Sequence, residues 1–345
     1  MKLARWITVA GSCFLAVLLS LPVWGADTDT DSRRQAMPGT LNYVEGQASI
    51  GDQTLTSKEV GTAELQNGQV LETRNGKAEI LLTPGVYLRL GSNSAAEMVS
   101  TDLTNTQVAL QRGEAMLEVD QIYKENFIHV SQPGADTQVL KTGLYDFDAT
   151  NQQMRVFDGK AIVSANDRST TVKGGHALAL NTDNLKSHDF DKKQVAQNDD
   201  LYRWSSLRSQ YLSQANIDTA GLYYANGWYG PGWWGPGWYW NPWFAGYTFL
   251  PGAGFLYSPF GWGFYSPLVV WHAPYYGVFH GYYHFDGTRP AAIGNGFSNH
   301  AVTSFPGATS GVPARGFSSG GFHGGGFHAG GFGGGGFHGG GGGHR

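Results

Sequence analysis

Short runs of alternating apolar and polar residues, separated by turns that contain glycine, constrain the fold of this chain more than any other feature. In the run "VYLRL", Val86, Leu88 and Leu90 fall on one side of an extended chain. Tyr87 and Arg89 fall on the other side. Because side chains alternate between the two faces of a strand, the pattern predicts β-strands with one buried and one solvated face. The dipeptides that predict tight hairpin turns between such runs are Asn67-Gly68, Asn75-Gly76 and Asp158-Gly159.

The region with this pattern, residues 38–182, is predicted to form an all-β domain. Glycine turns recur along it without intervening helical periodicity, which is typical of a sandwich, a jelly roll or a β-solenoid. A stretch of about 145 residues is long enough to bury a core of its own. We therefore expect a mainly β protein, and the residues leave the choice among the three architectures open.

The order of the strand and glycine motifs resembles that of a known family. The segments "LQNGQVLETRNGKAEILLTPGVYLRLGSNSAAEM", "VALQRGEAMLEV", "TGLYDFDA" and "MRVFDGKAIV" follow the pattern of the FecR domain over about residues 45–180. The resemblance implies a periplasmic, non-enzymatic β domain, which in the best-known members relays a signal from an outer-membrane receptor to a cytoplasmic sigma factor. Those members carry an anti-sigma segment before a transmembrane helix. With only a few residues before its first apolar run, this chain looks like the stand-alone secreted kind.

The first 26 residues have the order of a secretory signal peptide. Lys2 and Arg5 precede an apolar run over residues 7–21, and the small residues Gly25 and Ala26 follow a proline. This order predicts cleavage after Gly25 or Ala26 and export to the periplasm or cell surface. The alternative is an uncleaved membrane anchor, since the run approaches the length that spans a bilayer. The only cysteine, Cys13, lies within this segment, so cleavage would leave a chain without disulfides or thiolate metal sites.

Formal charge is distributed unevenly along the chain. Residues 27–218 contain 18 Lys and Arg against 26 Asp and Glu, whereas residues 219–285 contain none of these four types. An acidic domain lacks the dense basic stripe that phosphate contacts require. Nucleic acid is therefore a poor partner for this protein.

Residues 191–217 show the spacing of an amphipathic helix. Asp199 or Asp200 is placed to cap it. The apolar stripe predicted for this helix consists of Leu201, Trp204, Leu207, Tyr211 and Leu212. We expect the helix to close the β domain, and the alternative is an exposed helix that binds a partner.

Residues 221–285 form an aromatic segment rich in Gly and Pro. Tryptophan recurs every five residues, at Trp228, Trp233, Trp238 and Trp243. Gly-Pro-Gly units between them suit type II turns, so we expect a row of turns that present indole rings for surface association. Further on, the repeated Tyr-Ser-Pro unit predicts two short aromatic strands that end near Pro259 and Pro267. The alternative is that these aromatic side chains pack on one another and on the β domain.

Residues 287–345 are predicted to be disordered, because Gly, Ser and Ala dominate them. Phenylalanine recurs there every five residues, and the candidates for surface association are Phe322, Phe327, Phe332 and Phe337. The histidines of this tail are candidate ligands of a weakly bound metal ion, namely His323, His328, His338 and His344. Closing glycine-rich loops around one ion costs entropy, so the aromatic spacing favours an adhesive tail over a metal site.

No catalytic motif stands out in the sequence, and we expect neither an enzyme nor a cofactor. The carboxylate pairs Asp146/Asp148 and Asp189/Asp191 are interpreted as solvated, with Asp146 and Asp148 on the outer face of a strand. We expect a non-catalytic envelope protein that associates with a glycan, a lipid surface or an envelope protein, and self-association stays open. We identify no small-molecule substrate. The alternatives are a signalling module that binds a receptor by strand addition, and a weak metal binder based on the histidine-rich tail.

Overall fold

The computed structural model describes residues 36–181, 185–225 and 235–270. The predicted signal peptide, the glycine-rich tail, Trp228 and Trp233 lie outside these residues. The described part is mainly β, as the sequence predicted.

Fifteen strands form one sheet, and almost every pair in it is antiparallel. The strands are β1 (Leu41–Ile50), β2 (Gln53–Leu55), β3 (Val70–Leu81), β4 (Val86–Leu90), β5 (Ala95–Asp102), β6 (Asn105–Arg112), β7 (Glu114–Val119), β8 (Phe127–Gln132), β9 (Ala135–Val139), β10 (Gly143–Asp148), β11 (Gln153–Asp158), β12 (Lys160–Ala165), β13 (Arg168–Lys173), β14 (His176–Ala179) and β15 (His188–Asp189). Their spatial order is β13-β12-β9-β8-β6-β5-β3-β4-β7-β10-β11-β14-β15, with β1 beside β3 and β2 beside β1. The pair β6–β8 is parallel.

The sheet folds over along β3, so that its two halves face each other. The first residues of β3 pair with β5, and its last residues pair with β4. Inward side chains from both halves form one core cluster, with Ile80, Leu88, Val130 and Phe147 among its fully buried members. Two facing halves around a shared core are common to all three architectures considered.

The bend in β3 falls at Gly76, which the sequence placed in a hairpin turn. Gly76 lies inside the strand and opposes Gly46 of β1 at a register shift. A Cβ atom on Gly76 would lie 2.4 Å from the carbonyl oxygen of Glu45, so only glycine allows this close backbone approach. The Asn75-Gly76 prediction was wrong because a glycine in a strand pattern also marks a bulge or a close contact.

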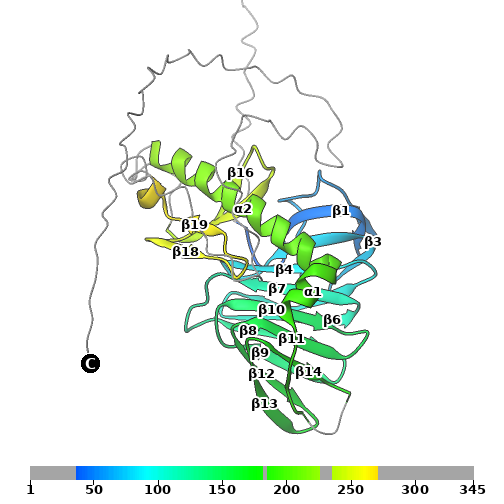
Figure 1. Ribbon diagram of the computed structural model, residues 1–345. Coiled ribbons are helices and arrows are strands. Elements are labelled where there is room, and N and C mark those ends of the chain that lie inside the picture. The colour runs from blue at the N-terminus through cyan, green and yellow to red at the C-terminus, as the bar shows by residue number, and fades with distance from the viewer. Residues whose placement is uncertain (1–35, 182–184, 226–234, 271–345) are drawn as a thin grey trace, which may run out of the picture. The chain divides into compact units, whose positions relative to one another are not determined.

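The outer face of one half of the sheet is covered, whereas the sequence predicted solvated outer faces. Every residue of β4 and of β10 is buried. The covering elements are α1 (Lys192–Asn198), α2 (Asp200–Ala225), β16 (Gly237–Asn241), β17 (Gly246–Leu250), β18 (Phe255–Tyr257) and β19 (Gly263–Tyr265). Figure 1 shows α2 running beside the yellow hairpin strands, and α2 contacts both these strands and the strands β4 and β7. Strands covered on both sides bury their polar positions as well, which local alternation alone does not reveal.

The predicted helix is divided in two at Asp199. The Asp199 carboxylate accepts a hydrogen bond from the backbone N–H of Tyr202 at 2.9 Å and so caps α2, which agrees with one of the two predicted caps. The predicted apolar stripe is only partly correct, since Leu201 and Leu212 are buried but Leu207 is 46% exposed. The polar members of the buried face of α2 are Ser205, Arg208, Ser209, Ser213, Asn216 and Thr219. No helix within the described ranges combines the length and apolar character needed to cross a bilayer.

The aromatic segment forms two hairpins. β18 and β19 are the two short strands that the sequence predicted, and they pair with each other, as β16 pairs with β17. Trp238 lies on β16 and is only 7% exposed, so the expectation that it presents its ring at the surface is not met. Its indole packs edge-on against Tyr87 with ring centroids 4.8 Å apart. Trp243, in the turn between β16 and β17, is 81% exposed.

Candidate functional site: a buried charged seam

Three charged side chains lie side by side on the covered face of the sheet. Glu79 of β3 is the cross-strand neighbour of Arg89 on β4, and Glu118 lies on the next strand, β7. The Arg89 guanidinium donates from Nε to Glu79 Oε2 at 2.7 Å and from Nη1 to Glu118 Oε2. All three side chains are fully buried. A cation between two carboxylates satisfies charges that would otherwise be costly to bury.

Helix α2 completes this row from above. Arg208 donates to Glu79 Oε1 at 2.8 Å, and its guanidinium lies 4.0 Å from the ring centroid of Tyr43. The hydroxyl of Ser209 donates to Glu118 Oε1 at 2.6 Å. We refer to the set Glu79, Arg89, Glu118, Arg208 and Ser209 as the charged seam.

Opposite charges keep Glu79 ionised within the seam. Burial opposes ionisation of Glu79, but the Arg208 and Arg89 guanidinium groups outweigh it and lower the pKa of this carboxyl to about 2. The pKa of Glu79 is therefore lower in the folded chain than in the unfolded chain. Its ionised form stabilises the fold fully at pH values above the pKa of the unfolded chain, and this stabilisation is lost as the pH falls towards 2. The ion pair between Glu79 and Arg208 is therefore an acid-sensitive contact between the sheet and α2.

A neighbouring carboxyl behaves in the opposite way. Burial, followed by the negative charge of Glu118, raises the pKa of Asp120 well above its ordinary value. Asp120 follows β7 directly and lies at the end of the seam. Three carboxyls, Glu79, Glu118 and Asp120, thus share this buried region with the two cations Arg89 and Arg208, and the excess of negative charge favours the protonated form of Asp120.

A second set of charged side chains links the sheet to the point where α1 ends and α2 begins. Arg155 of β11 donates from Nε to Asp146 Oδ2, and from Nη2 to Asp199 Oδ2 at 3.1 Å. The prediction that Asp146 and Asp148 face water was wrong, because the helices cover this part of β10 and bury both carboxyls. Asp148 accepts hydrogen bonds from the backbone and side chain of Asn151. Asp191, by contrast, caps α1, and the Asp189 side chain is largely exposed.

Asp146 provides a test of pH dependence. Burial raises its pKa to about 7, against the pull of Arg155, while the negative charges of Asp199 and Glu114 add to the rise. Between about pH 4 and pH 7 the folded chain holds a proton on Asp146 that the unfolded chain has released, so stability falls as the pH rises through this window. We expect Asp146→Asn to reduce this slope by up to about 1.4 kcal/mol per pH unit. Urea unfolding at several pH values measures the slope, and an unchanged slope would contradict the assignment.

Side-chain amides and hydroxyls fasten the aromatic hairpins to α2 and to the sheet. Asn216 donates from Nδ2 to the carbonyl oxygens of Phe249 and Tyr265, and its Oδ1 accepts from the N–H of Tyr265. Asn42 makes a reciprocal pair with the backbone of Tyr247, at 2.7 and 3.0 Å. These bonds satisfy hairpin backbone groups that two-stranded sheets leave unpaired. The hairpins are thereby attached both to α2 and to strand β1 of the β domain.

The seam is placed for structure rather than for chemistry on a substrate. Ser209 and Glu118 resemble a nucleophile with its base, yet both side chains are fully buried between α2 and the sheet. Within the described ranges, no group of three or more His, Cys, Asp and Glu is arranged to hold a metal ion. Among the described histidines, His129 contacts Asp136 and His176 contacts Asp189, each at 3.1 Å.

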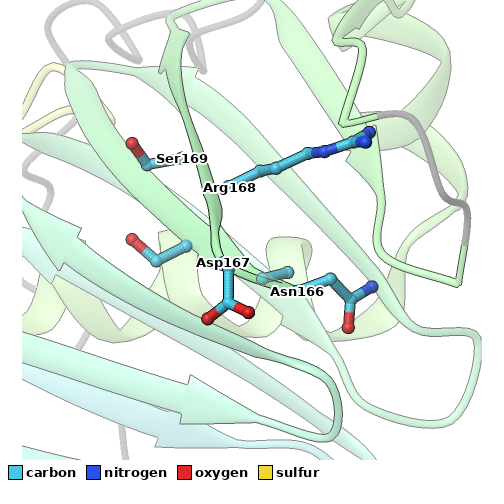
Figure 2. Close-up of a pocket in the computed structure, with 6 residues that line it drawn as sticks. Asn166, Asp167, Arg168 and Ser169 are labelled. Atoms are coloured by element: carbon cyan, nitrogen blue, oxygen red, sulfur yellow. The ribbon is translucent and has the colours of Figure 1, made fainter.

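A shallow surface hollow lies at the turn between β12 and β13. Asn166 and Asp167 take positive φ angles there, as a two-residue hairpin turn requires. In Figure 2 the side chains of Asp167 and Arg168 diverge from each other, and no set of polar groups converges on one point. The hollow therefore has no set of side chains arranged to bind a ligand.

Comparison with known proteins identifies the class of this β domain. A sequence profile described as "FecR protein" matches residues 69–162, from just before β3 to the middle of β12. The chain therefore contains a FecR-type domain, as the resemblance in the sequence indicated. The match covers less than a third of the chain and excludes α2 and the hairpins. No curated protein matches the chain.

Two solved structures are similar to part of the chain. Both are crystal structures, at 2.50 and 1.65 Å resolution, of a protein from Parabacteroides distasonis that is assigned provisionally as an anti-sigma factor. Each is 16% identical over 37% of this chain, with TM-scores of 0.32 and 0.33. The chain spans 63% of the length of these structures.

Most of the candidate residues from the sequence lie outside the described residues. Of the eight aromatic candidates for surface association, Trp238 and Trp243 are described, and the others lie outside the described residues. The candidate metal ligands also lie outside: His323, His328, His338 and His344. Their metal binding stays a prediction, which calorimetric titration with zinc would test.

Sequence reasoning missed the charged seam, although a signal for it was present. The outward positions of β3, β4 and β7 carry opposite charges at Glu79, Arg89 and Glu118. The same faces also carry large apolar side chains, such as Tyr87 and Met116. Large apolar residues beside charges on an outward face indicate that something covers that face.

Proposed function

We propose that the protein is an exported, non-catalytic binding protein of the cell envelope, in which the FecR-type domain carries the aromatic hairpins to an envelope partner. The observation that carries this proposal is the exposed indole of Trp243, held at the turn of a hairpin that is fastened to the domain. An indole offers an apolar ring face and a polar N–H, which suits a sugar ring or the headgroup level of a bilayer. The order of residues 1–26 supports export.

Co-sedimentation with isolated envelope material tests the proposal. The protein would begin at Asp27, after the expected cleavage site, and would be compared with the variant Trp243→Ala. We expect the variant to bind about fivefold more weakly or worse, since truncation of an interfacial anchor costs more than about 1 kcal/mol. Leu222→Ala is the matched control, because Leu222 is an exposed apolar residue on α2 and lies outside the hairpins. Equal binding by wild type and Trp243→Ala would refute the role of this residue.

A truncated chain separates the contribution of the tail. The cut belongs after residue 270, because a cut before β16 would remove the hairpins that cover Tyr87 and Leu81. Retained binding by residues 27–270 assigns the association to the described hairpins. Binding that requires residues 271–345 assigns it to the tail and its phenylalanines instead.

A second candidate function is binding of a receptor by strand addition. The observation that favours it is the position of β13, which ends the order of the sheet and pairs with β12. An edge strand can accept an extended segment of another protein through backbone hydrogen bonds. A photo-crosslinking residue at Thr171 on β13 would capture such a partner in cells. The same residue at Gln107 on the inner strand β6 is the control, and equal crosslinking at both positions counts against the edge.

A further inference from the structure

The β domain has a core that is complete without the elements covering it. Every buried member of the central cluster lies between Leu41 and Leu180. From the covering elements, Trp240 packs against the rim of this cluster. Loss of the cover would therefore leave the facing halves of the sheet packed on each other.

The covering elements are also joined to one another. Ser213 of α2 donates to the carbonyl oxygen of Gly263 at 2.6 Å, and Thr248 of β17 donates to that of Leu212 on α2 at 2.7 Å. Asn216 links α2 to both hairpins at once. These bonds join α2, β16–β17 and β18–β19 to one another.

The surface between the two units has the chemistry of an exchangeable contact. Glu79, Arg89 and Glu118 lie at its centre on the sheet, and Arg208 and Ser209 meet them from α2. Permanent interfaces resemble a domain core and are depleted of charge, whereas contacts between separable domains are more polar. Charged groups regain their hydration when such a contact opens, which offsets part of the lost attraction.

We propose that α2 and the strands β16–β19 form a releasable strap, which leaves the outer face of the sheet as one unit while the β domain stays folded. Two apolar clusters flank the seam and keep the closed state dominant. One joins Tyr87 to Trp238 and Phe249, and the other joins Met116 to Tyr202 and Phe260. Release exposes the row Glu79–Arg89–Glu118 to solvent. The proposal does not depend on the identity of any envelope partner.

Hydrogen exchange of the full-length mature protein, followed by mass spectrometry, tests the strap. Regions that open together exchange through a common opening with its own free energy. We expect amides of α2 and of β16–β19 to share one rate, about tenfold or more above the rate of β6, β8 and β10. A single rate for all of these elements would mean that the strap opens only when the whole protein unfolds, and would overturn the proposal.

Variants at two arginines on α2 sharpen the test. Arg208→Ala removes the bond to Glu79, so exchange of α2 and the hairpins should rise about tenfold further while β6 and β8 stay unchanged. Arg203→Ala is the control, because Arg203 is 58% exposed and contacts Asp200 at 3.5 Å. Equal acceleration of the strap and of β6 in Arg208→Ala would contradict the proposal. If Arg208→Ala does not fold, the wild-type rates decide alone.

Discussion

Arg89→Ala is expected to destabilise the protein by about 3–5 kcal/mol, because it leaves Glu118 buried without its cation. The guanidinium of Arg89 lies between Glu79 and Glu118, and all three side chains are excluded from solvent. Glu79 keeps Arg208 after the substitution, whereas Glu118 keeps only the hydroxyl of Ser209. Urea unfolding followed by circular dichroism measures the loss.

The matched control for this experiment is Arg112→Ala. Arg112 contacts Glu72 at 3.4 Å and is 51% exposed, so its loss should cost less than about 1 kcal/mol. A cost below about 1 kcal/mol for Arg89→Ala would show that the buried carboxyls become neutral without penalty. The seam would then not hold α2 through charge.

Trp238→Ala is expected to cost about 3–5 kcal/mol, as truncation of large buried aromatic residues usually does. The Trp238 ring packs edge-on against Tyr87 and Phe249, with centroid separations of 4.8 and 5.9 Å. Its loss opens a cavity between the hairpin and the sheet. The midpoint of thermal unfolding, with the slope of urea unfolding, reports the change.

Trp243→Ala is the natural comparison, since it lies five residues further along the same periodic sequence. Its exposed ring should contribute within about 0.5 kcal/mol to stability. Similar losses of stability in the two variants would contradict the burial assigned here. A large loss in Trp238→Ala alone would show that the period of five combines a core residue with a surface residue.

The inward face of the β domain was predictable from the sequence. Val86, Leu88 and Leu90 follow strand alternation, and each of them lies in the central core. The Tyr-Ser-Pro repeats likewise predicted β18 and β19. These features are local, so a period of two residues and a few turn residues are sufficient to identify them.

The outward face was not predictable by the same reasoning, because its environment is set by residues that are distant in the sequence. Strand alternation predicted that Asp146 faces solvent, whereas Asp199 and the helices cover it in the structure. Arg208 meets Glu79 across 129 positions in the sequence. Helix periodicity also pointed to Leu207 as part of a buried stripe, whereas the buried face of α2 contains Arg208 and Ser209. A polar helix face is buried here because the sheet offers charged partners to it.

The folded-over sheet also has a consequence for how fast the protein reaches its native state. Strands of the two halves alternate along the chain: β4, β7, β10 and β11 belong to one half, whereas β5, β6, β8, β9 and β12 belong to the other. No continuous segment can therefore complete either half. Pairings that are distant in sequence require closure of many loops before their contacts form, which slows folding. We expect this chain to fold slowly for its size. We also expect that the whole stretch from β1 to β14 must be present before any part of the core is stably packed.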